Sequence, residues 1–223
     1  MVDVHTNNPD VILYGGAFDP PHQGHFDCVK LCLKKFPNSK IIVAPTKVSP
    51  GVGGKQKKSN APFEHRYELS RRLFAKHPMW EKLIEVSAIE ATLPVPNFTV
   101  RSLGALQKQF STSSIGLLLG LDQLQAFGSW YQPFKIAEMA SLIVSPRSSY
   151  SSQKGMRDSR NEIVNHLIRK EAKVAPLVVL LEGETCPVSS SEIRDSLFKR
   201  SSISFQWMSK DIQDYIIDNN LYV

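Results

Sequence analysis

Two histidines three residues apart form the most distinctive chemical pattern in this sequence. His22-Gln23-Gly24-His25 follows an apolar run at residues 11–14 and the glycine pair Gly15-Gly16. This order predicts a buried strand, a tight turn and the start of a helix. A helix start presents unbonded N–H groups and partial positive charge, so two imidazoles beside it favour anionic oxygens such as those of phosphate. Two ordinary surface histidines are the alternative interpretation.

A second cluster of this kind lies near the C-terminus, in Ser189-Ser190-Ser191-Glu192-Ile193-Arg194. Ser189 and Glu192 have the spacing of a capping box, which predicts a helix start. Serine hydroxyls and free backbone N–H groups, with Arg194 one turn into the helix, could bind another phosphate. A helix start without a ligand is the alternative. The sequence thus offers two candidate phosphate sites far apart in the chain.

Predicted strands and helices alternate along most of the chain. Apolar runs predict strands at residues 11–14, 40–44, 82–86, 115–119, 141–145 and 177–181. Helical spacing or helix-start signals predict helices at residues 25–36, 62–76, 98–110, 161–170, 190–199 and 210–219. This alternation predicts an α/β fold: a Rossmann-like, doubly wound parallel sheet with helices on both faces.

Two polar stretches interrupt this alternation. Residues 150–160 are interpreted as a loop, and residues 45–60 as a long loop rich in Gly, Ser and Lys. A loop of that length in a compact α/β domain indicates a substrate lid or a mobile segment. In such sheets ligands bind beyond the carboxyl ends of the strands, where the first histidine pattern is expected. The dinucleotide fingerprint G-x-G-x-x-G is missing from that turn.

Composition narrows the class of protein. The 223 residues are 42% hydrophobic and 22% charged, which fits one well-buried core. The formal net charge of +6 suits polyanions in general. No apolar run approaches the roughly 20 residues of a membrane span, and residues 1–10 lack a signal-peptide pattern, so a cytoplasmic location is predicted. Cys28, Cys32 and Cys186 are expected to be buried, unpaired residues.

The stretch from Gly15 through Ala17, Phe18, Asp19 and Gly24 to His25 resembles the signature of nucleotidyltransferases with the H-x-G-H motif. More narrowly, it is similar to bacterial nicotinate mononucleotide adenylyltransferases, whose usual threonine or serine after the two glycines is Ala17 here. The C-terminal cluster is similar to the family's I-S-S-T-x-x-R motif. The resemblance implies these roles: catalytic, His22, His25 and Arg194; ATP-binding, Gly15, Gly16, Ala17, Phe18, Gly24, Ser189, Ser190 and Ser191.

Further blocks at residues 62–66, 97–103 and 120–124, the last followed by Trp130, resemble the same family. The resemblance implies that Lys47, Thr99, Asp122 and Trp130 bind the mononucleotide, with the indole near the pyridine ring. A core aromatic is the alternative for Trp130. The family's P-P-H-K pattern is missing from the loop after the second strand, which leaves the choice between the acid and the amide substrate open.

The resemblance implies transfer of AMP from ATP to nicotinate mononucleotide, giving deamido-NAD and pyrophosphate, in NAD biosynthesis. Mg²⁺ is the implied cofactor, held mainly by phosphate oxygens and water, with Asp19 in contact through water. One nucleotidyltransferase domain is expected over residues 1–223, with residues 182–223 a C-terminal helical segment that carries the second motif. ATP and a pyridine mononucleotide are the expected partners, without nucleic acid or membrane, and a homo-oligomer stays open.

Several alternatives compete with this interpretation. Within the superfamily they are a nicotinamide mononucleotide adenylyltransferase, a pantetheine-phosphate adenylyltransferase and a cytidylyltransferase; the last two fit residues 120–130 poorly. A non-catalytic nucleotide-binding module is another class, disfavoured because His22, His25 and Arg194 are all present. A nucleic-acid-binding protein would explain the positive charge, but an aromatic-basic platform of the RNA-binding type is missing.

Overall fold

In the computed structural model, the structure describes residues 8–51, 56–75, 78–146, 153–169, 177–199 and 206–222. Within these residues, six strands form a parallel sheet in the order β5-β2-β1-β6-β7-β8. Their bounds are β1 (Val11–Gly16), β2 (Lys40–Pro45), β5 (Ile84–Val86), β6 (Ile115–Gly120), β7 (Ser141–Ser145) and β8 (Val178–Leu180). The strand order reverses beside β1, so loops after β1 and β6 border the crevice expected for ligands.

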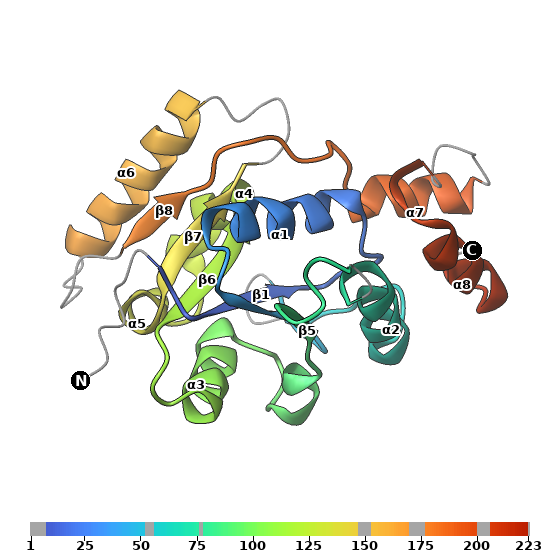
Figure 1. The fold of residues 1–223 in the computed structure, drawn as a ribbon, viewed down its shortest axis with the longest axis horizontal. Helices are drawn as coiled ribbons and strands as arrows, with labels where there is room; N and C mark the ends of the chain where they lie inside the picture. The colour runs from blue at the N-terminus through green and yellow to red at the C-terminus, as the bar shows by residue number, and fades with distance from the viewer. Residues whose placement is uncertain are drawn as a thin grey trace.

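Helices cover both faces of this sheet, as Figure 1 shows for α1 and α3. Because side chains alternate along a strand, Ile12 and Tyr14 of β1 pack in one apolar cluster and Leu13 in another. Helices on the first face are α1 (Gln23–Lys35) and α2 (Phe63–Phe74). Helices on the second face are α3 (Thr99–Gln109), α5 (Pro133–Met139) and α6 (Gln153–Arg169). The predicted doubly wound α/β fold is confirmed.

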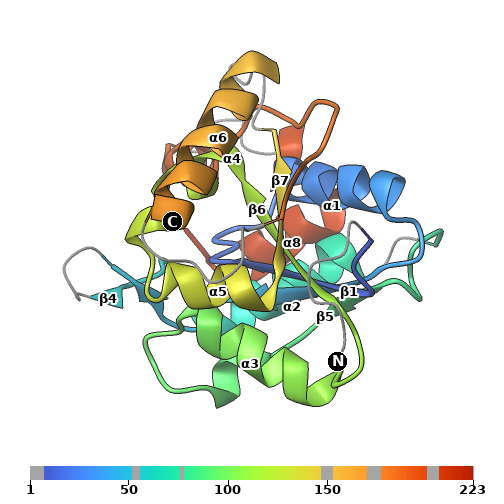
Figure 2. The ribbon, with the colours of Figure 1, turned by 90° about the vertical axis from the view of Figure 1, so that its left-hand side faces the viewer.

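Figure 2 shows that α3 and α5 lie side by side. Shorter elements fill the connections between strands and helices, and two further helices follow the sheet. The shorter elements are the antiparallel pair β3 (Ser49–Pro50) and β4 (Gln56–Lys57), the 3₁₀ turns η2 (Ile89–Thr92) and η3 (Phe127–Ser129), and α4 (Leu121–Ala126). The last helices, α7 (Ser190–Phe198) and α8 (Lys210–Asp218), pack against α2 through an apolar cluster that includes Leu69, Ile193 and Ile212.

One sequence prediction was wrong and two others need correction. Residues 153–160, predicted as loop, form the first half of α6. Met156 and Ile163 are seven residues apart on one buried face, and the polar residues between them hid that periodicity. Residues 45–60, predicted as loop, contain the β3–β4 pair, although residues 52–55 lie outside the described residues. β5 begins at Ile84, two residues later than predicted, because residues 82–83 belong to a turn.

None of the described helices combines the length and the apolar character that crossing a bilayer requires. The expectation of a single domain over residues 1–223 stays a prediction.

Candidate functional site: two helix starts at the carboxyl end of β1

The histidine pair begins α1, immediately beyond the end of β1. His22 is the N-cap of the helix, and its backbone N–H donates to Nδ1 of His25 at 3.2 Å. The two imidazole rings lie 3.8 Å apart between centroids, and Phe18 packs its edge against His25 at 5.1 Å. His22 is buried and His25 half-buried. The rings are therefore held together at the positive end of a 13-residue helix.

The serine cluster begins α7 in the way its spacing predicts. Ser189 is the N-cap, and its Oγ accepts a hydrogen bond from the backbone N–H of Glu192 at 3.2 Å. The Glu192 carboxylate in turn accepts from the backbone N–H of Ser189 at 2.8 Å. The predicted capping box is confirmed. Because that box uses the Ser189 hydroxyl, Ser190 and Ser191 are the hydroxyls left for other contacts at this helix start.

The two helix starts, some 170 residues apart in sequence, are bonded directly to each other. Ser190 Oγ donates to the carbonyl oxygen of Pro20 at 2.9 Å. Arg194 donates through Nη1 to the carbonyl oxygen of Asp19 at 2.7 Å and through Nη2 to Ser191 Oγ at 3.1 Å. Both acceptor carbonyls lie in the loop between β1 and α1. The structure therefore brings the predicted catalytic arginine and the predicted catalytic histidines to one place.

A second set of contacts holds the segment before α7 along the side of α1. A Cβ added to Gly24 would lie 2.9 Å from the carbonyl oxygen of Cys186, closer than such contacts allow. The Asp27 carboxylate accepts from the backbone N–H of Cys186 at 2.9 Å. Further along, Gly183 has φ of +134° and leaves space for Leu31. Gly24 thus leaves space for the segment before α7, and Asp27 holds that segment by its hydrogen bond to Cys186. No sequence pattern marked Asp27 as a candidate.

The glycine pair at the end of β1 has one closed side and one open side. A Cβ on Gly16 would lie 3.1 Å from the Phe18 ring, whereas a Cβ on Gly15 would have no heavy atom of the described residues within 4 Å apart from its own chain neighbours. Gly15 and Ala17 are exposed, so their backbone groups are accessible. This geometry suits the expected close approach of a ligand. The ATP-binding roles of these residues stay predictions.

Asp19, expected near a metal, is committed to protein contacts. It is buried, and Oδ2 accepts from the backbone N–H of Asn60 at 2.7 Å while Oδ1 accepts from the backbone N–H of Ala61 at 3.0 Å. These bonds tie the loop after β1 to the start of α2. Among the described residues there is also no group of three or more His, Cys, Asp or Glu arranged for a metal. The Asp19 contact to metal stays a prediction.

The residues expected to bind the mononucleotide come from separate loops. Thr99 begins α3, and Lys47 is exposed just after β2. Asp122 lies in the first turn of α4, directly after β6; the missing side chain of Gly120 lets its carboxylate fold back, since a Cβ there would lie 2.7 Å from Oδ1. Lys47 and Asp122 thus follow the carboxyl ends of β2 and β6, the two strands that flank β1.

Aromatic side chains join two of these loops. The Phe98 and Tyr131 rings pack in a tilted arrangement with centroids 4.4 Å apart, which brings the residue before Thr99 against the residue after Trp130. Trp130 itself is half-buried, 5.4 Å from the Phe127 ring, and packs on the edge of the core. Its position suits both the core and the binding interpretation. Sequence analysis did not single out Tyr131; its place beside Trp130 was the available signal.

A buried polar network supports the loop after β2. Asn97 accepts from the backbone N–H of Val48 at 2.8 Å and donates through Nδ2 to the carbonyl oxygen of Glu90 at 2.8 Å. The Glu90 carboxylate accepts from Ser102 Oγ at 2.7 Å. Burial raises the pKa of Glu90 to about 7, and the hydrogen bonds from Ser102 and Thr46 and the nearby charge of Arg66 oppose that rise. No periodic pattern in the sequence marks this network.

Comparison with known proteins decides the family. A family model described as cytidylyltransferase-like matches residues 13–196, which include both helix starts. The chain belongs to this family. Similar proteins include a probable nicotinate-nucleotide adenylyltransferase of Dictyoglomus thermophilum, 29% identical over 95% of this chain and 98% of the relative. Another relative of that name, from Methylacidiphilum infernorum, is 26% identical over 98% of this chain and 94% of its own length.

Solved structures share the fold of this cytidylyltransferase-like chain. One is described as Plasmodium falciparum nicotinic acid mononucleotide adenylyltransferase complexed with NaAD; it is 20% identical, has a TM-score of 0.74, and the match covers 95% of this chain and 96% of that one. A putative nicotinate-nucleotide adenylyltransferase from Vibrio parahaemolyticus gives a TM-score of 0.61 at 17% identity, covering 95% and 94%. At these identities the likeness confirms the fold.

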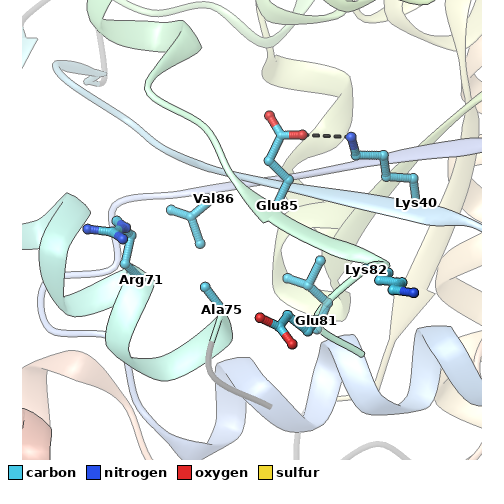
Figure 3. A pocket seen from close by; sticks show the side chains of 8 residues that line it. Lys40, Arg71, Ala75, Glu81, Lys82, Glu85 and Val86 are labelled. Carbon is cyan, nitrogen blue, oxygen red and sulfur yellow. Dashed lines mark ion pairs between the residues drawn. The ribbon is translucent and has the colours of Figure 1, made fainter. Parts of the chain in front are cut away.

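A pocket elsewhere on this family member is lined by residues of β5 and its neighbours. Figure 3 shows Lys40 pointing toward Glu85, and their charged atoms lie 2.7 Å apart. Lys40 begins β2, so this pocket lies at the amino ends of the strands. The helix starts lie at the opposite, carboxyl ends, where ligands of such sheets bind. The pocket is therefore not part of the candidate site.

The cysteines were expected to be buried, and the structure bears this out in part. Cys32 is fully buried, whereas Cys28 and Cys186 are partly exposed, and all three are free thiols. Burial raises the pKa of all three, in the case of Cys186 to about 11. Thiols with such pKa values are protonated near neutral pH, which does not favour nucleophilic chemistry.

Proposed function

We propose that this chain transfers AMP from ATP to nicotinate mononucleotide, giving deamido-NAD and pyrophosphate, in NAD biosynthesis. The observation that carries the proposal is the direct bonding of the two helix starts through Ser190 and Arg194. One site with two phosphate-binding helix ends, an arginine and paired imidazoles suits a triphosphate. The relatives named nicotinate-nucleotide adenylyltransferase support the choice of the second substrate.

The proposed reaction requires little covalent help from the protein. A phosphate oxygen of the mononucleotide attacks the α-phosphorus of ATP; a new P–O bond forms, and the bond to the oxygen bridging to the β-phosphorus breaks and releases pyrophosphate. The nucleophile is already an anion, so no side chain must remove a proton. The protein's contribution is to position the two substrates and to stabilise charge on the phosphoryl oxygens.

Each helix start takes one part of this task. His22 and His25 donate to oxygens of the α- and β-phosphates as negative charge accumulates there. Arg194, Ser190 and Ser191 hold the departing pyrophosphate. Gly15 to Phe18 and Gly24 bring backbone N–H groups close to the nucleotide. Lys47, Thr99, Asp122 and Trp130 hold the mononucleotide, with the half-buried indole stacked on its ring.

Mg²⁺ is proposed as the cofactor bound together with ATP. When bound, it neutralises charge on the phosphate oxygens. The residues present fit an ion held mainly by phosphate oxygens and water, because the described part of the chain provides no cluster of protein ligands. Asp19 would contact it only through water, since its oxygens already accept hydrogen bonds from Asn60 and Ala61. We further propose a cytoplasmic location.

A panel of substrates tests the proposed function. Purified protein is given ATP, or CTP, with nicotinate mononucleotide, nicotinamide mononucleotide or phosphopantetheine, and pyrophosphate release and product mass are measured. We expect deamido-NAD from ATP and nicotinate mononucleotide as the fastest reaction. A preference for the amide would reassign the substrate. ATP binding in calorimetry without turnover on any acceptor would instead support a non-catalytic nucleotide-binding module.

A further inference from the structure

The largest side chain that is fully buried among the described residues is a charged one, Arg66 of α2. Only 1% of its surface is exposed. Burying a guanidinium is costly unless hydrogen bonds and opposite charges compensate for the lost water. Its bonding partners therefore show what the side chain is placed to hold.

Arg66 donates to three backbone carbonyls on three different segments. Nη1 donates to Ala17 at 2.6 Å, Nη2 to Lys47 at 3.3 Å and Nε to Ala61 at 3.0 Å. Ala17 belongs to the turn proposed to bind ATP, and Lys47 to the loop proposed to bind the mononucleotide. Because the guanidinium is planar and rigid, its donors fix the spacing between these carbonyls.

Opposite charges compensate for the burial of Arg66. Burial lowers its pKa from the usual value, and the nearby carboxyl groups of Asp19, Glu64 and Glu90 oppose that shift. Asp19 also binds the backbone of Asn60 and Ala61, the segment that leads into the helix of Arg66. Glu90 belongs to the polar network that supports the loop after β2.

We propose that Arg66 is a positioning residue that sets the alignment of the ATP turn with the mononucleotide loop. This inference rests on the proposed function, because it concerns the relative placement of its two substrates. Arg66 is not assigned a contact with either substrate. It acts through Ala17 and Lys47, so its loss should impair the joining of bound substrates more than the binding of each one.

The variant Arg66→Lys tests this role. Lysine keeps the positive charge but presents its donors from one point, so it cannot span the three carbonyls. We expect kcat to fall about 10- to 100-fold, the scale of a small misplacement of the reacting groups. Calorimetry measures the dissociation constants for nicotinate mononucleotide and for the α,β-methylene analogue of ATP separately. We expect each dissociation constant to change less than about threefold, which is a smaller effect than the fall in kcat.

Arg72→Lys is the matched control. Arg72 lies on the same helix, but it binds Glu68 and Asp211 and lies 4.5 Å from the Tyr215 ring. These contacts to Asp211 and Tyr215 hold α8 against α2. We expect kcat near the wild-type value in this control, even where its melting temperature falls as far as that of Arg66→Lys. Wild-type kcat in Arg66→Lys, or raised dissociation constants at unchanged kcat, would overturn the proposal.

Amide hydrogen exchange on the wild-type protein gives a test that does not depend on the variant's folding. We expect the ATP analogue alone to slow exchange at residues 47–48, and nicotinate mononucleotide alone to slow exchange at residues 17–19. If Arg66→Lys folds, the ATP analogue should still slow exchange at residues 17–19, and nicotinate mononucleotide should still slow exchange at residues 47–48. Neither ligand should then slow exchange in the loop proposed to bind the other ligand. Independence of the two loops in the wild type, or an effect on the other loop that survives in the variant, would overturn the proposal.

These outcomes are distinct from a failure of the proposed function. If wild-type protein makes no dinucleotide from any mononucleotide, the proposed function fails. If wild-type protein makes deamido-NAD and Arg66→Lys makes it at the same kcat, the inference about Arg66 fails alone.

Discussion

On the side proposed for ATP, two short segments meet and bond directly: Ser190 and Arg194 donate to carbonyls of the turn that precedes His22. On the side proposed for the mononucleotide, separate loops are held by the contact between the Phe98 and Tyr131 rings and by the buried Asn97–Glu90 network. The first side is defined by contiguous motifs, and the second by long-range packing. A changed motif residue should therefore affect turnover strongly, whereas a changed support residue within the mononucleotide side should affect affinity or stability. Arg66, which bonds to both sides, should affect turnover.

The largest effect is expected for His25. In His25→Asn the amide oxygen can still accept from the backbone N–H of His22, so the helix start is kept while the imidazole donor is lost. We expect kcat to fall about 100- to 1,000-fold, the scale for losing one preorganised donor, with little change in ATP affinity. Steady-state rates and calorimetry measure both quantities.

His65→Asn is the control, because His65 contacts Tyr215 on α8 instead of the site. Its turnover should stay near that of the wild type. If His25→Asn retains turnover within about tenfold of the wild type, the catalytic assignment of the histidine pair is wrong.

Gly24→Ala tests the contact between α1 and the second motif. Its Cβ would lie 2.9 Å from the Cys186 carbonyl oxygen, so the segment leading to Arg194 must move. We expect a loss of about 1–3 kcal/mol in the free energy of unfolding and roughly tenfold in kcat/KM. Urea unfolding and steady-state kinetics measure these changes.

The matched control is Gly104→Ala, at a helical glycine whose added Cβ would meet only the end of Met139 at 3.9 Å. Alanine is the better helix former, so that variant should gain about 0.5–1 kcal/mol. Equal effects of the two substitutions would remove Gly24 from the account of how the motifs meet.

Trp130→Ala decides between the binding and the core interpretations of this residue. If the indole stacks on the pyridine ring, losing about 0.5–1.5 kcal/mol raises the KM for the mononucleotide about 2- to 12-fold and leaves the KM for ATP unchanged. Trp80→Ala, a half-buried tryptophan 5.8 Å from Phe26, should cost stability without this selective change. If Trp130→Ala has an unchanged KM for the mononucleotide and a lowered stability, Trp130 is a core aromatic and does not bind the pyridine ring.

The smallest effect on turnover, and a clear effect on stability, is expected for Glu90→Gln. Burial raises the pKa of Glu90 from 4.5 to about 7, so between these pH values the folded protein holds a proton that the unfolded chain has released. Stability therefore falls as pH rises through this window. The difference of about 2.5 pH units corresponds to up to about 3 kcal/mol, which Glu90→Gln should remove.

Urea unfolding at pH 5 and pH 8 measures this effect. Glu81→Gln is the control, because the side chain of Glu81 is exposed. The Glu81→Gln control should keep the pH dependence of the wild type. An unchanged difference between the two pH values in Glu90→Gln would show that Glu90 does not cause it.

Local patterns in the sequence predicted the sheet, most of its helices and the capping box at Ser189, because each depends on neighbouring residues. The same reasoning failed at residues 153–160, where Met156 is the one buried apolar side chain among polar residues. Arg66 and Asp27 could not be placed from sequence, because their partners lie in distant segments. Glu90 bonds to Ser102 nearby in the chain, but no periodic pattern marks that pair. The two motifs lie at helix starts, as their spacing predicted, and the roles of their residues stay predictions.

The central claim is that the two bonded helix starts form one site for transfer of the α-phosphoryl group. Wild-type protein and the stable His25→Asn variant are incubated with nicotinate mononucleotide and ATP labelled at either the α- or the γ-phosphorus. We predict that α-label enters deamido-NAD and γ-label leaves only in pyrophosphate, at a rate that collapses in the variant. Transfer of γ-label to the mononucleotide, or no labelled dinucleotide from the wild type, would contradict the claim.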